Sequence, residues 1–359
     1  MRNWRNVPTT LWHLLIVTLL GLPLVMPLLR LTSVPCTHDG HLHVHRVAAM
    51  RHAWENGLFF TRWLPDLAFG YGYPFFVYRE PTPLYAVMLP HLLGAPMAAA
   101  SNLFYALCIL AAGWFMFLWV NDLAGTRAGL VSAVAYMAAP YVLIDALIRG
   151  NAPESLALPL FPLLLWVGRR WILQGSVKTF LLSVFGLAFL SLSHNISIFI
   201  FAPLFLLYLV AIGWLHKTSW RPLLAKLLLL FGLGLGMTFF YTGGALLEMD
   251  EVTLSQSTVT RNNDFHFNFA SWAEILAPVA AEDPTLLNPP LPIRLGWVPV
   301  VLAIMGLSTP FWRKLTREQR WHVWMMALAA ALFLFMALPI SLALWENIPP
   351  VSYTHLTLP

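Results

Sequence analysis

Charged residues are scarce in this sequence, and cysteines are almost absent. Only 10% of the 359 residues are Asp, Glu, Lys or Arg, whereas an ordinary soluble domain has roughly 25%. The two cysteines, Cys36 and Cys108, are too few for a disulfide framework. These shortages exclude a disulfide-stapled secreted scaffold and argue against a water-soluble globular domain.

Long apolar runs take the place of the missing charge. The chain is 59% hydrophobic with a mean hydropathy of +0.70, and several runs reach the roughly 20 residues that a spanning helix needs. The first run follows Arg2 and Arg5 and is too long for a signal-peptide core, so we interpret it as an uncleaved anchor. We predict an all-α polytopic membrane protein with about nine transmembrane helices. The predicted spans are 11–29, 98–120, 128–148, 155–173, 178–193, 196–215, 222–247, 294–311 and 321–342.

The placement of basic residues predicts the topology. Segment 83–95 is apolar but short, and we interpret it as a helix lying along the outer membrane surface. With that assignment, 13 of the 21 Lys and Arg residues fall on the N-terminal side, together with only Asp122 and Glu318 of the 16 acids. The positive-inside rule then makes the N-terminus cytoplasmic and two long loops, about 31–97 and 248–293, extracytoplasmic. The net charge of +5 therefore reports topology in a cell membrane, and we expect the lipid bilayer, not nucleic acid, as the partner.

The first outer loop contains the longest polar interval of the chain. It holds five of the twelve histidines, and its first carboxylate is Asp39. We predict a helix over 38–57, capped by Thr37 or Asp39 and ended by Gly57. At about 100° per residue, Asp39, His43 and Arg46 then share one arc of roughly 60°. The other histidines of the loop form a second arc, at positions 38, 41, 45 and 52.

Several roles are open to these side chains. A carboxylate at position 39 suits a general base toward an acceptor hydroxyl, or a metal ligand. The guanidinium of Arg46 suits a phosphate oxygen. The histidine arc suits a transition metal, although a merely solvated polar face explains it without one. We expect no cofactor, with a divalent metal as the lesser alternative.

Two shorter motifs mark the outer ends of later spans. Arg149 and Glu154 flank the start of the fourth predicted span, where charge is costly unless it is paired or solvated. They either pair with each other, or Arg149 binds a lipid phosphate while Glu154 orients it. His194 interrupts a long apolar stretch and is either a helix-turn residue with a satisfied hydrogen bond or a support for the same site. The loop 248–293 mixes acids, amides, aromatics and prolines, as a binding loop or lid does.

The order of these pieces resembles the GT-C class of integral-membrane glycosyltransferases, which includes protein O-mannosyltransferases and aminoarabinose transferases. Asp39 follows the first span closely, as the catalytic acid does in that class. The segments 57–66 and 70–74 and the prolines at positions 81 and 83 follow in the same order. The resemblance implies a large first outer loop with surface helices and a polyprenyl-phosphate-linked sugar as donor. Unlike many members, which carry two neighbouring acids there, this loop begins with Asp39 alone among histidines.

A second set of motifs is spread over the whole chain. Its positions are His38-Asp39 with Arg46, Arg62-Trp63 with Pro65-Asp66, Gly70 to Pro74, Arg149-Gly150 with Glu154, His194-Asn195, and Leu344-Trp345-Glu346 with Ile348-Pro349. In these positions the chain resembles bacterial membrane proteins that carry the family name "6-pyruvoyl-tetrahydropterin synthase-related". No soluble domain or convincing zinc triad supports the pterin part of that name.

These resemblances imply a glycosyltransferase that moves a sugar from a polyprenyl-phosphate donor to an acceptor on the extracytoplasmic face. Asp39 would be its catalytic residue. The expected substrate-binding residues are Arg46, His43, Arg149, Glu154 and His194. A transporter or flippase of a lipid-linked precursor is the alternative, and a non-catalytic membrane protein is a third.

The end of the chain differs in character from the rest. Residues 351–359 (VSYTHLTLP) resemble a translated sequencing-adaptor read-through, and in the resembling proteins the segment at 344–349 leads into further spans. We therefore expect 1–350 to be a single, truncated transmembrane domain and 351–359 to be a non-native tail.

Overall fold

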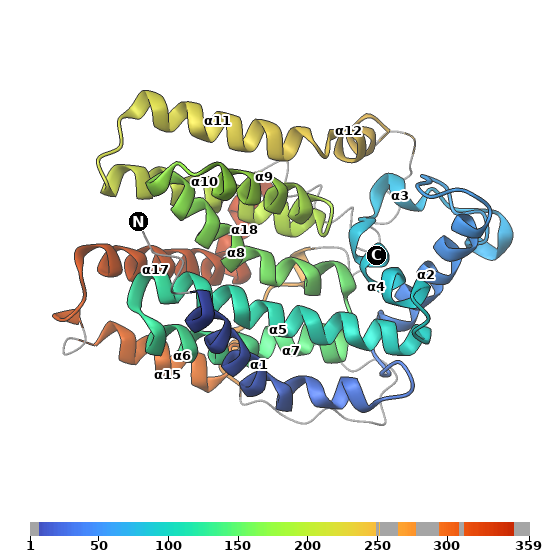
Figure 1. Ribbon diagram of the computed structural model, residues 1–359, viewed down its shortest axis with the longest axis horizontal. Helices are drawn as coiled ribbons and strands as arrows, with labels where there is room; N and C mark the ends of the chain where they lie inside the picture. Colours follow the sequence, from blue (N-terminus) through green and yellow to red (C-terminus); the bar gives the residue numbers. More distant parts are fainter. Residues whose placement is uncertain (1–6, 249–250, 252–264, 278–293, 309–311, 348–359) are drawn as a thin grey trace. The chain divides into compact units, whose positions relative to one another are not determined.

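The computed structural model describes residues 7–248, 251, 265–277, 294–308 and 312–347 (Figure 1). Its regular elements are helices, and the described residues contain no strand beyond an isolated bridge between Leu64 and Tyr73. This confirms the predicted all-α fold. The chain divides into two compact units, one made of 1–138 with 142–244 and the other of 139–141 with 245–359.

The first unit is a bundle built around two long apolar helices, α5 (Met97–Ala124) and α8 (Ala152–Gln174). Helix α5 packs against α1 (Val7–Arg30), α6 (Thr126–Met137) and α8. Helix α8 also packs against two later helices, α9 (Val177–Ser191) and α10 (Asn195–Leu215). A helix that is apolar on all sides must be buried in protein or lipid. These two helices therefore form the centre of the unit.

Among the described residues, five helices are long and apolar enough to cross a membrane: α1 from Thr9, α5, α8, α10 and α17 (Arg317–Ala337). The number rises to seven if two bent pairs each count as one span. In the first pair α6 meets the segment Pro140–Arg149 at 45°, and in the second α11 (Trp220–Gly236) meets α12 (Phe239–Leu247) at 70°. A multi-pass membrane protein is thus confirmed.

The predicted number of nine spans exceeds what the described residues support. The predicted span 178–193 corresponds to α9, which has only 15 residues, and the predicted span 294–311 corresponds to α15 (Trp297–Leu307), which has 11. Both are shorter than the roughly 20 residues of a typical spanning helix. Hydropathy recognised these segments as apolar but could not give their helical length.

The segment 31–97, which belongs to the first unit, contains several short helices. Helix α2 (Gly40–Glu55) matches the helix predicted over 38–57, and Gly57 follows its end with φ +80°. Helix α4 (Thr82–Leu92) has 11 residues and packs on α2, α5 and α8. It is too short to span, whereas its position along the membrane surface stays a prediction.

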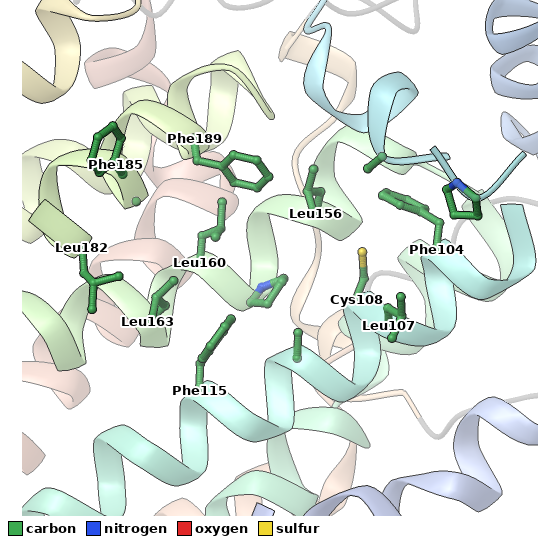
Figure 2. A pocket seen from close by; sticks show the side chains of 15 residues that line it. Phe104, Leu107, Cys108, Phe115, Leu156, Leu160, Leu163, Leu182, Phe185 and Phe189 are labelled. Atoms are coloured by element: carbon green, nitrogen blue, oxygen red, sulfur yellow. The ribbon is translucent and has the colours of Figure 1, made fainter. Parts of the chain in front are cut away.

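An apolar pocket opens on this bundle between α5, α8 and α9 (Figure 2). Helix α8 packs against both α5 and α9. The pocket therefore has α8 as its floor and the other two helices as its walls, with α4 contributing Ala86 and Pro90. Its volume is about 470 Å³.

The second unit contains α14 (Trp272–Ile275), α15, α17 and α18 (Leu342–Asn347). Helices α14 and α17 each begin with a capping box, at Ser271 and Thr316. In each box the hydroxyl oxygen accepts the backbone N–H of the residue three positions later. The indole of Trp345 donates to the carbonyl of Met336. Most of the loop 248–293, and all of the tail 351–359, lie outside the described residues.

Candidate functional site

The start of α2 lies against the turn that precedes α8. The backbone N–H of Asp39 donates to the carbonyl of Arg149 (2.8 Å), and that of His38 donates to Ile148 (3.1 Å). The hydroxyl of Tyr105, on α5, donates to the carbonyl of Gly150. Three segments that are far apart in sequence are thereby joined through backbone groups, and Asp39 is held beside Arg149 whatever its side chain does.

Gly150 makes this close approach possible. Its φ of +67° lies in the left-handed region, and a Cβ there would collide with the Thr37 hydroxyl oxygen and meet the backbone nitrogen of Gly40 at 2.9 Å. That same hydroxyl accepts the N–H of Gly40 at the start of α2 (3.1 Å). A side chain at position 150 would therefore disturb both the turn and the helix start.

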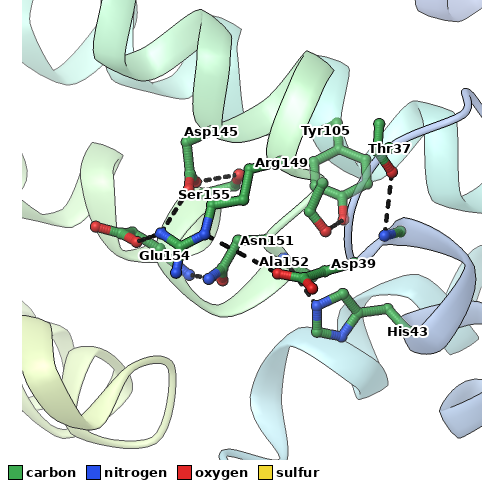
Figure 3. A network of polar contacts seen from close by, with 12 residues as sticks. Thr37, Asp39, His43, Tyr105, Asp145, Arg149, Asn151, Ala152, Glu154 and Ser155 are labelled. Atoms are coloured by element: carbon green, nitrogen blue, oxygen red, sulfur yellow. Dashed lines mark hydrogen bonds and ion pairs between the residues drawn. The ribbon is translucent and has the colours of Figure 1, made fainter. Parts of the chain in front are cut away.

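Three carboxylates surround the guanidinium of Arg149 (Figure 3). Its nitrogens lie 2.6 Å from Glu154, 3.5 Å from Asp145 and 3.9 Å from Asp39. The Asp145 side chain is 1% exposed, while that of Asp39 is 36% exposed. The cluster thus runs from a buried carboxylate through a shared cation to an accessible carboxylate. We call Asp39, Asp145, Arg149 and Glu154 the carboxylate cluster.

Two local features position this cluster. Residues Asp145–Arg149 form a single π-helical turn, a rare geometry that is frequent at functional sites. The side chain of Asn151 accepts the N–H of Glu154 (3.0 Å) and so caps α8. The hydroxyl of Ser155 donates to the other oxygen of Asp145 (2.7 Å). Sequence reasoning missed Asp145, although an acid inside a predicted span is itself a signal of function.

His43 lies next to the carboxylate cluster and is buried, with 6% of its surface exposed. Its Nε2 accepts the backbone N–H of Ala152 (3.4 Å), and its Nδ1 lies 3.5 Å from the guanidinium of Arg46. Burial, and then the positive charges of Arg46, Arg79 and Arg149, lower the pKa of His43 to about 3. The imidazole is therefore neutral at physiological pH.

Two arginines give this region a positive charge that no carboxylate cancels by direct pairing. Arg46 stacks over the ring of Phe75 (5.0 Å to the centroid). Burial and the nearby charge of Arg79 lower the pKa of Arg46 to about 10, which leaves it protonated at pH 7. Within the described part of the chain neither Arg46 nor Arg79 forms an ion pair with a carboxylate. Arg79 was not among the expected binding residues, because sequence alone did not place it near α2.

His194 belongs to a different group of polar contacts. Its Nδ1 lies 2.7 Å from the hydroxyl of Ser197, one turn along α10. The N–H of the next residue, Asn195, donates to Glu80 (2.7 Å), which lies just before α4. Among the described contacts no hydrogen bond or ion pair joins His194 to the carboxylate cluster. This geometry matches the alternative in which His194 is a bonded helix-turn residue.

The remaining histidines of α2 do not gather around one point. The Nε2 of His52 lies 3.8 Å from Asp66, away from the start of the helix. In the portion of the chain that the structure describes, no three His, Cys, Asp or Glu side chains are arranged to hold a metal ion.

Comparisons with known proteins show a distant relative of this chain. The chain is 26% identical over 178 residues to an uncharacterized protein of Lactococcus lactis subsp. cremoris (strain MG1363). The match covers 48% of this chain and 29% of that protein. No family model matches the chain, and no solved structure matches it.

Proposed function

We propose that this protein is a membrane glycosyltransferase that moves a sugar from a polyprenyl-phosphate donor to an acceptor on the extracytoplasmic face. One observation carries the proposal: a partly exposed carboxylate, Asp39, lies in one cluster with Arg149 and Glu154. Beside that cluster lie Arg46 and Arg79, which form no ion pair with a carboxylate among the described residues. A base next to an anion-binding pair of guanidiniums is what sugar transfer from a phosphate requires.

In the proposed reaction Asp39 takes the proton of the acceptor hydroxyl. The acceptor oxygen then forms a bond with the anomeric carbon of the sugar, and the bond from that carbon to the phosphate oxygen breaks. The electron pair of the broken bond leaves with the polyprenyl phosphate. Arg46 and Arg79 stabilise the negative charge that develops on this leaving group.

Arg149 is expected to act on the base and not on the phosphate. Its guanidinium is already surrounded by three carboxylates, which leaves little net positive charge for a further anion. It orients the Asp39 side chain through the 3.9 Å ion pair between the two groups. Glu154 holds Arg149 from the other side, and the neutral His43 fixes the start of α8 through Ala152.

The test replaces Asp39 by Asn in the protein reconstituted in liposomes. With a radiolabelled polyprenyl-phosphate hexose and an envelope extract as acceptor pool, the release of free polyprenyl phosphate is measured. We expect Asp39→Asn to lower the release at least 100-fold, the lower end of what a general base contributes. Asp66→Asn, a substitution of an exposed acid in the same loop, is the matched control and should keep wild-type release. Wild-type release by Asp39→Asn would overturn the assignment.

A transporter or flippase of a lipid-linked precursor is the second candidate. The two bent helix pairs, at 45° and 70°, favour it, because broken helices line the substrate sites of many transporters. The two functions differ in their product. A transporter moves a fluorescent polyprenyl-phosphate sugar between leaflets with its glycosidic bond intact, whereas the transferase breaks that bond.

A further inference from the structure

Helix α10 begins without a side-chain cap of its own. Its N-cap residue is His194, whose side chain makes no capping hydrogen bond and lies beside the hydroxyl of Ser197 instead. The first turn of a helix has backbone N–H groups without intrahelical partners. One of them, the N–H of Asn195, donates to a carboxylate oxygen of Glu80 (2.7 Å), 115 residues earlier in the chain. The carboxylate of a distant segment therefore caps α10.

Further contacts tie the segment around Glu80 to the same turn. The side-chain amide of Asn195 donates to the carbonyl of Tyr78 (3.3 Å), and the N–H of Thr82 donates to the carbonyl of Leu192 (3.3 Å). Residues on both sides of Glu80 are thus bonded to the turn between α9 and α10. Glu80 is itself buried, and a buried carboxylate needs a hydrogen-bond donor. The start of α10 supplies that donor and, through the helix dipole, a partial positive charge.

Glu80 also lies close to the two arginines that are proposed to bind phosphate. Arg79 precedes it in the chain, and the N–H of Arg79 donates to the carbonyl of Phe75 (3.0 Å). The guanidinium of Arg46 stacks over the ring of the same phenylalanine. The charges of Arg79 and Glu80 both act on Arg46. In the part of the chain that the structure describes, however, no ion pair joins Glu80 to either arginine.

This arrangement is unusual for a carboxylate beside two guanidiniums. Such groups form strong charge-assisted hydrogen bonds with each other when they are free to meet. A pair of that kind would cancel positive charge that a phosphate group needs. The bond to α10 gives the carboxylate another partner, so the positive charge of the arginines stays unpaired.

We propose that the hydrogen bond from the Asn195 N–H holds Glu80 away from Arg46 and Arg79, and so leaves both guanidiniums available to a phosphate group. Asn195 and Glu80 are positioning residues in this role, because they act through the two arginines. The inference rests on the proposed function and adds how its phosphate-binding charge is kept free. It also gives the turn at 194–195 a part in the site through its second residue.

A proline at position 195 removes the N–H without a conflict with the helix. The first position of a helix tolerates proline, and His194 before it is extended (φ −158°, ψ 115°), as the residue before a proline prefers. Asn195→Ala is the reference, because it loses the same side-chain amide but keeps the N–H. Val177→Pro is the matched control, since it makes the same change at the exposed first residue of α9.

The measurement is the affinity of the purified full chain, in detergent, for farnesyl phosphate and for farnesol. The ratio of the two affinities isolates the phosphate group, because both molecules have the same isoprenoid chain. We expect this ratio to be about tenfold lower in Asn195→Pro than in Asn195→Ala, as for the loss of one charge-assisted hydrogen bond. Val177→Pro should keep the wild-type ratio. Equal ratios in Asn195→Pro and Asn195→Ala would overturn the proposal.

A second substitution separates the effect of charge from damage to the helix. Glu80→Gln removes the negative charge that the proline variant releases toward the arginines. In the double variant Asn195→Pro with Glu80→Gln, the ratio should return to the value of Asn195→Ala. A proline that only distorted α10 would distort it in the double variant too. A ratio that stays low there would therefore contradict the proposed role of Glu80.

Failure of this inference and failure of the transferase give different results. If sugar is transferred and the transfer depends on Asp39, but Asn195→Pro and Asn195→Ala prefer farnesyl phosphate equally, the positioning role is refuted and the function stands. If no sugar is transferred, but the preference is lost in Asn195→Pro and restored by Glu80→Gln, the positioning role stands and the transferase is refuted.

Discussion

Acidification should destabilise this protein at the buried side chain of His43. The imidazole is buried against Ala152, and its pKa is lowered from 6.5 to about 3 by burial and by Arg46, Arg79 and Arg149. Between those two values the unfolded chain binds a proton that the folded chain does not. The contribution of the neutral His43 imidazole to the free energy of unfolding is therefore fully present above pH 6.5 and is lost as the pH falls toward 3.

The size of the effect follows from the difference between the two pKa values. At pH 5 the imidazole of the unfolded chain, with a pKa of 6.5, is protonated, whereas that of the folded chain is not. The pH lies about 1.5 units below the unfolded pKa, and each unit corresponds to about 1.36 kcal/mol, so the free energy of unfolding falls by about 2 kcal/mol. For a domain of 150–250 residues each kcal/mol shifts the unfolding temperature by about 2–4 °C. We expect a decrease of about 4–8 °C between pH 7.5 and pH 5 from this residue.

Thermal unfolding in detergent at the two pH values measures this decrease. His43→Gln removes the titrating group, and its unfolding temperature should fall by about 4–8 °C less than that of the wild type over the same interval. His45→Gln replaces an exposed histidine of the same helix and should respond to pH as the wild type does. Equal pH responses of wild type and His43→Gln would refute the buried neutral imidazole.

Two substitutions next to the site should act through packing and charge. Arg149→Met leaves Glu154, whose carboxylate lies 2.6 Å from the guanidinium, without its cation and should lower the free energy of unfolding by about 3 kcal/mol. Glu154→Gln in the same chain should restore part of that loss, and no recovery in the double variant would contradict the pairing of Arg149 with Glu154. Gly150→Ala places a methyl group in collision with Thr37 at a left-handed backbone position. Gly175→Ala is its matched control, because φ is +65° there and no atom lies within 4 Å of the new methyl group. The control therefore has only the cost of the left-handed backbone, about 1–2 kcal/mol. Chemical unfolding should show the larger loss at position 150, and equal losses would refute the close approach of the two segments.

Local sequence patterns predicted part of the candidate site. Helical phase placed Asp39, His43 and Arg46 on neighbouring positions, and in the structure a guanidinium nitrogen of Arg46 lies 3.5 Å from the Nδ1 of His43. The pairing of Arg149 with Glu154 was also open to sequence reasoning, because the two lie five residues apart around one turn. The phase of one helix could not show that His43 is buried, since burial depends on which other segment covers that face.

Contacts between distant segments lay beyond that reasoning. Arg79 reaches His43 and Arg46 because α4 packs on α2, and nothing near position 79 in the sequence indicates this. Asp145 enters the carboxylate cluster through a π-helical turn, which has no recognisable sequence signal here. For His194 the sequence suggested a place in the site that the structure does not show. Its ring is hydrogen-bonded to Ser197 and belongs to another group of contacts.

The sequence alone determined the class of protein. A chain with so few charged and so many apolar side chains is stable where lipid replaces water around it. Backbone polar groups in lipid must be satisfied internally, and continuous apolar runs of about 20 residues do this as helices. An all-α membrane protein therefore follows from the composition and the length of the apolar runs. Tertiary structure decided how long each helix is, where two of them bend, and which charges meet. Those outcomes depend on packing between segments more than a hundred residues apart, as the hydrogen bond from Asp39 to Arg149 shows, and no local pattern contains that information.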